Sequence, residues 1–171
     1  MSASSTNLEL RMAEPADAPI ILELIHELAV YEKEPDAVDC TEEDILRDGF
    51  GPKPLWECLL ADWNGKTIGM ALFFPSWSTW SGRARLYLED LFVKPEARGL
   101  GAGVALLSRL TAIAQERQWA CVDWQVLDWN QMARDFYHRI GASHREEWLN
   151  YRIEGEAMAR LAARSPEVPE E

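Results

Sequence analysis

The chain has 171 residues, of which 47% are hydrophobic and 27% charged, and its formal net charge is −12 at pH 7. This composition is that of a globular protein rather than a disordered chain, and the acidic balance argues against nucleic acid as a partner. No apolar run approaches the ~20 residues that span a bilayer, and no leader peptide is evident, so we expect a cytoplasmic protein without a membrane partner. Cys40, Cys58 and Cys121 lack metal-ligand spacing, which predicts reduced thiols and no metal site.

The first fifty residues or so predict one strand and two helices. Residues 7–12 alternate apolar and polar side chains, which is typical of a strand. Asp17 can cap a helix whose early Pro19 needs no N–H partner. An apolar stripe at helical spacing follows, formed by Ile21, Leu24, Ile25 and Leu28. The spacing of Thr41 and Asp44 is that of a capping box and predicts a second, short helix.

An acidic loop is expected between these two helices, at residues 31–39. Such a loop is either a solvated surface segment or a lip that binds a cation, and the residues alone leave both interpretations open. The negative charge of the whole chain is compatible with a cationic substrate, because a negative field steers cations toward the protein.

Two apolar runs flank Asn64-Gly65, a dipeptide that strongly favours a two-residue hairpin turn. We therefore expect paired strands over residues 55–63 and 66–74. The following segment, 76–83, has the composition of a polar loop that carries Trp77 and Trp80.

Residues 86–93 predict the central strand of the sheet, although the adjacent pair Glu89 and Asp90 interrupts its apolar run. Neighbouring strand residues face opposite sides, so both carboxylates cannot point to solvent if the sheet is covered on both faces. A charge in an apolar strand is costly unless it is paired or functional. The pair is therefore either a set of satisfied or edge-exposed acids or part of a functional site.

A glycine-rich segment follows this strand and opens a helix that we expect over about residues 101–117. The N–H groups of a helix's first turn lack internal partners and can bind a phosphate, while Arg98 can add a charge-assisted contact. The segment is not a Walker loop, because no Lys-Ser/Thr follows the glycines. It is not a dinucleotide fingerprint either, because Gly99, Gly101 and Gly103 have a different spacing.

The remaining residues predict alternating strands and helices. We expect a strand over 119–127, a helix over 130–140 that Gly141 ends, and one or two strands over 143–153. A final helix follows at 155–164. We find no linker that would divide the chain, so we expect a single domain over 1–164 and a disordered tail over 165–171.

Two motifs resemble those of a known superfamily. Leu91-Phe92-Val93-x-Pro95, followed by Arg98-x-x-Gly101-x-Gly103, resembles the loop with which the GNAT N-acetyltransferases hold the pyrophosphate of acetyl-coenzyme A. Asn130, together with Asp135-Phe136-Tyr137-x-x-x-Gly141-Ala142, resembles that superfamily's second cofactor element. The resemblance covers most of residues 7–153. Further segments resemble the diamine (spermidine/spermine) acetyltransferase branch, which also contains thialysine acetyltransferases: 27–32, 48–51, 86–93 and 129–130.

The resemblance implies a mixed α/β (α+β) fold with a single twisted mixed sheet, splayed central strands and flanking helices. It implies transfer of acetyl from acetyl-CoA, as co-substrate, to a primary amine of a small cationic substrate, either a polyamine or a lysine-like amine such as thialysine. Such proteins usually form twofold dimers, so we expect a homodimer, with which eight tryptophans are compatible. The Trp77–Trp80 loop would then approach either the substrate entrance or the dimer partner.

Roles for individual residues follow from the same resemblance and from the chemistry. An alkylamine has a pKa near ~10 and must lose a proton before it attacks, so Glu89 is the candidate base, through a water, and Tyr137 the candidate acid for the leaving thiolate. The implied cofactor-binding residues are Leu91, Phe92, Val93, Arg98, Gly99, Leu100, Gly101, Ala102, Gly103, Val104, Asn130 and Tyr137. The candidate substrate-binding residues are Tyr31, Glu32, Glu89, Asp90, Asp123, Gln125 and Glu147.

Other functions remain open at this point. A non-catalytic acyl-CoA-binding module would keep the glycine-rich loop but would not need Glu89 or Tyr137. An acetyltransferase of protein amines, or an interaction protein that kept only the fold, are further alternatives. A Tyr137→Phe substitution distinguishes an enzyme from a binding module.

Overall fold

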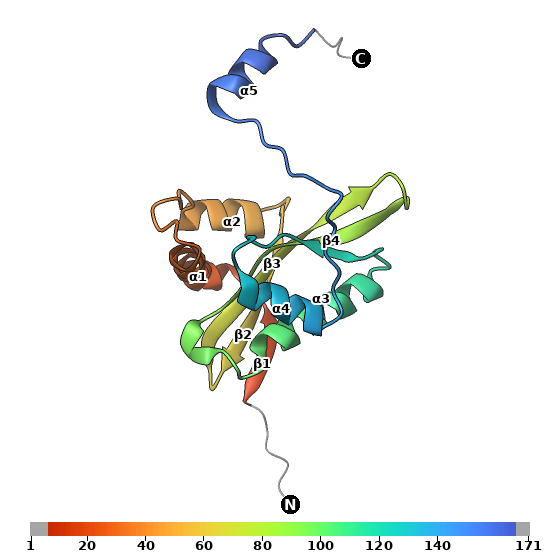
Figure 1. Ribbon diagram of the computed structural model, residues 1–171. Coiled ribbons are helices and arrows are strands. Elements are labelled where there is room, and N and C mark those ends of the chain that lie inside the picture. Colours follow the sequence, from red (N-terminus) through yellow and green to blue (C-terminus); the bar gives the residue numbers. More distant parts are fainter. Residues whose placement is uncertain (1–6, 167–171) are drawn as a thin grey trace, which may run out of the picture. The chain divides into compact units, whose positions relative to one another are not determined.

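The computed structural model describes residues 7–166 of the chain (Figure 1). The chain forms two compact units, one extending to Gln125 and the other beginning at Val126, and each is described by itself. The expectation of one domain over 1–164 stays a prediction. The tail expected at 165–171 lies outside the described residues from position 167 onward.

The first unit consists of a five-stranded mixed sheet with helices. The strands follow one another in the order β1-β2-β3-β4-β5, with antiparallel pairing from β1 to β4 and parallel pairing between β4 and β5. The strands are β1 (Leu8–Met12), β2 (Glu57–Trp63), β3 (Lys66–Ser78), β4 (Arg83–Val93) and β5 (Val122–Trp124). Its helices are η1 (Pro15–Asp17), α1 (Ala18–Tyr31), α2 (Glu42–Phe50), η2 (Pro95–Ala97) and α3 (Ala102–Glu116). The mixed α/β fold with one mixed sheet is thereby confirmed, although β3 and not β4 is the middle strand of the described sheet.

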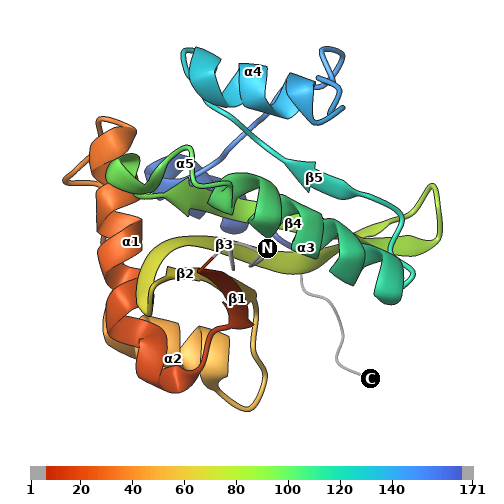
Figure 2. The same cartoon turned by 90° about the horizontal axis from the view of Figure 1, so that it is seen from below.

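The two faces of the sheet are covered by different helices. Helices α1 and α2 pack on one face, and the core there is a cluster of Ala18, Ile21, Leu24, Ile45, Cys58, Leu60, Met70, Leu72 and Phe92. Helix α3 lies against the other face (Figure 2), and its buried side chains include Leu106 and Leu110. The apolar stripe expected in α1 is confirmed as core, because Ile21 and Leu24 are fully buried.

The hairpin predicted at Asn64-Gly65 is confirmed, since Trp63 and Lys66 pair across the two-residue turn. The loop expected over 76–83 is shorter than predicted. Strand β3 continues to Ser78, which pairs with Arg83 of β4. The two strands stay hydrogen-bonded up to the turn at residues 79–82. Trp77 therefore lies on a strand and is 64% exposed, and Trp80 lies in the turn and is 88% exposed.

Three other expectations are corrected by the structure. Asp17 is the N-cap residue of α1, but its side chain makes no capping hydrogen bond, because its carboxylate accepts hydrogen bonds from Arg11 and from the backbone N–H of Glu14 instead. The strand expected over 119–127 is only Val122–Trp124, because pairing with β4 extends no further. Residues 143–153 form no strand, and their apolar side chains stay exposed without a strand partner among the described residues.

The second unit contains two helices, α4 (Gln131–Arg139) and α5 (Gly155–Ala162). Gly141 follows α4 with a φ of 90°, and the backbone N–H of Ala142 bonds to the carbonyl of Tyr137, so the predicted glycine stop is confirmed. In the described part of the chain, no helix combines the length and apolar character needed to cross a membrane.

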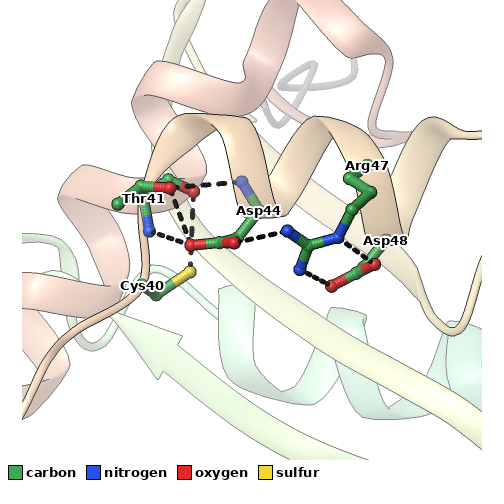
Figure 3. Close-up of polar contacts among 5 residues, drawn as sticks. All are labelled: Cys40, Thr41, Asp44, Arg47 and Asp48. Carbon is green, nitrogen blue, oxygen red and sulfur yellow. Dashed lines mark hydrogen bonds and ion pairs between the residues drawn. The ribbon is translucent and has the colours of Figure 1, made fainter.

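The capping box predicted for α2 is present (Figure 3). The Oγ1 of Thr41 accepts a hydrogen bond from the backbone N–H of Asp44 at 3.2 Å, and the Thr41 N–H donates to the Asp44 carboxylate at 3.0 Å. Arg47 donates to the other Asp44 oxygen at 2.8 Å and also binds Asp48. The cap therefore fixes the end of the acidic loop that precedes α2.

Thr41→Ala is expected to lower the free energy of unfolding by about 1 kcal/mol, because it leaves the N–H of Asp44 without its acceptor. Urea denaturation of the variant and the wild type measures this difference. Thr79→Ala, in the exposed turn between β3 and β4, is the matched control and should change little. Equal midpoints for Thr41→Ala and wild type would contradict the role of the cap.

Candidate active site

Strand β4 contains a β-bulge at Glu89. Leu88 pairs with Phe73 of β3, whereas Asp90 pairs with the preceding residue Leu72, so Glu89 is an additional residue with no partner on β3. A bulge of this kind changes which face the following side chains occupy. Leu88 lies on the side of Phe73, and Asp90 lies with Leu72 on the face that α1 and α2 cover.

The bulge explains how the chain accommodates two adjacent carboxylates. The side chain of Glu89 is exposed, and that of Asp90 is partly buried beside the α1–α2 core. Within the described residues, Asp90 makes no hydrogen bond or ion pair. Burial raises the pKa of Asp90 to about 6, and the nearby carboxylates of Glu89 and Glu32 contribute to this increase. Burial also raises the pKa of Glu32.

The chain after β4 forms a glycine-rich loop that ends at the first turn of α3. Gly99 and Gly101 both have a φ of 86°, a left-handed conformation that side-chain-bearing residues rarely adopt, and this explains glycine at both positions. Gly101 is the N-cap of α3 and supplies no side chain to the free N–H groups of the first turn. These N–H groups and the positive end of the helix dipole form a suitable site for an anionic group.

Two cations of this loop contact helix α1. Lys94 donates to the carboxylates of Glu23 and Glu27 at 2.6 and 2.8 Å. The guanidinium carbon of Arg98 lies 4.6 Å from the centre of the Tyr31 ring, and the Arg98 Nε–H points to the Val93 carbonyl at 3.4 Å. The fold thus brings Tyr31, predicted from sequence as a substrate residue, against Arg98, predicted as a cofactor residue.

Strand β4 has an unpaired backbone stretch beside the loop. Its parallel pairing with β5 covers only Leu86, Tyr87 and Leu88. On that side, residues 89–93 have no strand partner in the described part of the chain. The backbone N–H and C=O groups that point to this side between Leu91 and Val93 are therefore available to an extended ligand.

The other candidate substrate residues differ in their surroundings. Asp123 lies on β5 and forms an ion pair with Arg85 at 3.2 Å. Gln125 is exposed at the end of the first unit. Glu147 is exposed in the second unit, where its carboxylate accepts a hydrogen bond from Arg145 at 3.1 Å.

Asn130 and Tyr137 belong to the second unit. The side chain of Asn130 caps α4 by accepting a hydrogen bond from the N–H of Ala133 at 3.2 Å. Tyr137 lies on the same helix, half-buried, with its ring centre 5.4 Å from that of Phe136. Helix α4 and its N-cap therefore carry both residues that the resemblance implies for the second cofactor element.

Lys94, Glu23 and Glu27 contribute to the loop's environment although the sequence did not predict them as site residues. The two glutamates are four residues apart in a predicted helix, a spacing that puts both on one helix face and could have indicated a cation site. No local pattern identifies Lys94 as their partner, because it is distant in the chain. Among residues 7–166, no group of three or more His, Cys, Asp or Glu side chains could hold a metal ion.

Sequence comparison identifies the class of protein that this fold and loop define. Residues 21–142 match the Acetyltransferase (GNAT) family. The chain belongs to this family of N-acetyltransferases, whose members transfer acetyl from acetyl-CoA to an amine. The protein is accordingly an amine N-acetyltransferase, as the sequence resemblance predicted.

Two relatives are similar to almost the whole of this chain. A thialysine N-epsilon-acetyltransferase of Bos taurus is 40% identical over 166 residues, which are 91% of this chain and 97% of the relative. A spermidine/spermine N(1)-acetyltransferase-like protein 1 of Homo sapiens is 40% identical over 164 residues, covering 90% of this chain and 24% of the relative. The diamine acetyltransferase-like branch is thereby confirmed.

Solved structures share the fold. An integron cassette protein from the mobile metagenome of V. cholerae superposes with a TM-score of 0.78 at 27% identity, covering 91% of this chain and 98% of that one. The fold described above therefore has a counterpart among solved structures.

The buried carboxyl of Asp90 predicts a dependence of stability on pH. Its pKa of about 6 in the folded protein exceeds the ordinary value of 3.8, so the folded state binds more protons than the unfolded state between these values. The contribution of Asp90 to the free energy of unfolding therefore falls as the pH rises through this window, by on the order of 2–3 kcal/mol. Asp90→Asn should abolish this loss and be the more stable protein at pH 7.

Urea denaturation at a series of pH values measures the effect. Asp36→Asn, in the exposed part of the acidic loop, is the matched control and should follow the wild type. A wild-type stability that does not decline relative to Asp90→Asn as the pH rises from about 4 to about 7 would contradict the burial of this carboxyl.

Proposed function

We propose that the protein transfers the acetyl group of acetyl-CoA to a primary amine of a small cationic substrate, either a lysine-like amino acid such as thialysine or a polyamine. The observation that carries this proposal is the similarity to a thialysine N-epsilon-acetyltransferase over 97% of that protein's length. The net charge of −12, with Glu32, Glu89 and Asp90 interacting in one unit, supports a substrate that carries an additional positive charge.

The glycine-rich loop is the proposed site for the pyrophosphate of acetyl-CoA. Ala102, Gly103 and Val104 begin α3, so their N–H groups belong to the helix's first turn, and Gly99, Leu100 and Gly101 lead the chain to them. Arg98 adds a guanidinium beside this loop. The unpaired backbone of Leu91, Phe92 and Val93 is the proposed partner of the extended arm that carries the thioester. Asn130, in the second unit, is a further proposed cofactor-binding residue.

Glu89 is the proposed general base and Tyr137 the proposed general acid. The exposed carboxylate of Glu89 can accept the proton of the ammonium through a water, which leaves the neutral amine able to attack the thioester carbonyl. A backbone N–H of Phe92 or Val93 can stabilise the negative charge that develops on the carbonyl oxygen. As the C–S bond breaks, the phenol of Tyr137 can give its proton to the leaving thiolate, and the second proton that the nitrogen loses on becoming an amide can restore the phenol through solvent.

The proposed substrate side of the site contains Tyr31, Glu32 and Asp90 of the first unit. This supports the interpretation of the acidic loop as a cation-binding lip. The carboxylates of Glu32 and Asp90 are close enough for their negative charges to repel each other, and a cation between them would relieve that repulsion. Further proposed contacts are Asp123, Gln125 and Glu147. An acetyltransferase of protein amines remains the second candidate, and a module that only binds acyl-CoA is disfavoured by the family's activity.

Thiol release from acetyl-CoA with a panel of amines tests the proposal. The panel contains thialysine, lysine, spermidine, spermine, putrescine and a lysine peptide. We expect saturable turnover with thialysine or with a polyamine and little turnover with the peptide. Turnover confined to the peptide would overturn the proposed substrate class.

A matched pair of variants serves as the control for the chemistry. Tyr137→Phe should retain affinity for coenzyme A and lower kcat by about 100-fold, because it removes only the proton donor. His138→Gln, the exposed neighbour on α4, should retain wild-type turnover. Wild-type turnover by Tyr137→Phe would eliminate the assignment of Tyr137 as the acid.

We also propose that the protein is a homodimer. Apolar side chains of the second unit are exposed in the single chain, including Leu149 at 76% and Tyr151 at 92%. A group of neighbouring exposed apolar side chains often marks a surface that contacts another protein. Leu149→Lys should therefore convert a dimer into a monomer in light scattering after size-exclusion chromatography, and Gln115→Lys, on α3, is the control with the same charge change. A monomeric wild type would refute this proposal.

Cytoplasmic localisation is proposed from the thiols. Cys40, Cys58 and Cys121 form no disulfide in the described part of the chain, and burial raises the pKa of the Cys58 thiol to about 12, which makes it unreactive. Fractionation of cells that contain the protein tests this, and recovery outside the cytoplasmic fraction would contradict it.

A further inference from the structure

One face of α1 supports the segment that connects β4 to α3. Glu23, Glu27 and Tyr31 follow one another at intervals of four residues, which places them along a single stripe of the helix. Lys94 and Arg98 are also four residues apart and flank the short helix η2. The stripe receives both cations, Lys94 at the two glutamates and Arg98 at the tyrosine.

The contact at Lys94 is the rigid part of this arrangement. Its side chain is only 16% exposed, and its Nζ donates to two carboxylates on successive turns of α1. The hydrogen bonds to Glu23 and Glu27 raise the pKa of Lys94, so the side chain stays charged at neutral pH. Partial burial reduces the screening that weakens exposed ion pairs, so the end of β4 is held on α1.

The contact at Arg98 is of a different kind. The guanidinium carbon lies over the Tyr31 ring in a cation–π contact, and the N–H donors of a guanidinium lie in the group's own plane. Within residues 7–166, the two terminal nitrogens of Arg98 make no hydrogen bond or ion pair. Tyr31 is also the last residue of α1, where the negative end of the helix dipole attracts a cation.

The loop beyond Arg98 needs such support. Gly99 and Gly101 give it two glycines in left-handed conformation, and glycine loses more conformational freedom on ordering than any other residue. A loop that is already ordered binds its ligand more tightly, because less entropy is lost on binding. A fixed Arg98 also presents its donors in one direction.

We propose that Tyr31 is a positioning residue for the cofactor: its ring holds the Arg98 guanidinium so that the in-plane donors face the pyrophosphate of acetyl-CoA. This assignment rests on the proposed function, since it takes the glycine-rich loop as the pyrophosphate site. It gives Tyr31 a role separate from contact with the amine.

The experiment compares two acetyl donors in wild type, Tyr31→Leu and Tyr31→Phe. S-acetylpantetheine carries the thioester but lacks the pyrophosphate, so it cannot use Arg98 as acetyl-CoA does. Tyr31→Leu should raise the Kd for coenzyme A, measured by calorimetry, about fivefold. Because Tyr31 is also a proposed contact of the amine, kcat/KM can fall with both donors, but it should fall about fivefold further with acetyl-CoA than with S-acetylpantetheine. Tyr31→Phe keeps the aromatic face and should stay within about twofold of wild type with both donors.

Trp119→Leu is the matched control, because it removes another cation–π pair, in which the guanidinium carbon of Arg117 lies 4.9 Å from the centre of the Trp119 ring. It should leave the Kd for coenzyme A unchanged, and thermal melting of each variant verifies that it is folded. Equal losses with both donors, or a Tyr31→Phe variant as impaired as Tyr31→Leu, would overturn the proposal. A wild type that binds no coenzyme A would instead overturn the proposed function, and the inference with it.

Discussion

The additional residue in β4 is the constraint on which the rest of the site depends. Without the bulge at Glu89, strict alternation would keep Asp90 and Phe92 on the same face as Leu86 and Leu88, against α3. With it, β4 contributes Leu86 and Leu88 to one side of the sheet and Phe92 to the core on the other. The bulge therefore sets both the packing of the strand's second half and the direction in which the chain leaves the sheet toward the glycine-rich loop.

The second half of β4 lacks regular strand pairing, and it leads directly into the glycine-rich loop. The pairing of β4 with β5 ends at Leu88, one residue before the bulge. Strand β4 therefore loses its neighbour β5 close to the point where its register with β3 shifts. The strand is thereby half paired over residues 89–93, and the chain then turns through η2 into α3. Backbone groups, a helix N-terminus and two carboxylates thus come from one continuous stretch of sequence, and α1 supplies the surface that holds this stretch in place.

Much of this fold was predictable because its signals are local. The hairpin at Asn64-Gly65, the capping box at Thr41 and the glycine stop after α4 each depend on residues within one turn. The failures depended on partners distant from the local pattern. Asp17 is bound by Arg11, and β5 is short because β4 pairs with it over few residues. In the candidate site, the loop and its glycines were evident, but the bulge and the partners of Lys94 depend on tertiary register, which the alternation pattern does not encode.

The contact between Arg98 and Tyr31 also joins two ligands thermodynamically. Tyr31 precedes Glu32 at the lip, while Arg98 borders the loop, so the same ring adjoins both proposed binding regions. If one ligand changes the geometry of this pair so that the affinity for the other ligand changes, linkage requires the same factor in both directions. Cooperative binding of the two substrates can therefore arise from a single aromatic face, without a moving domain or a second conformation of the sheet.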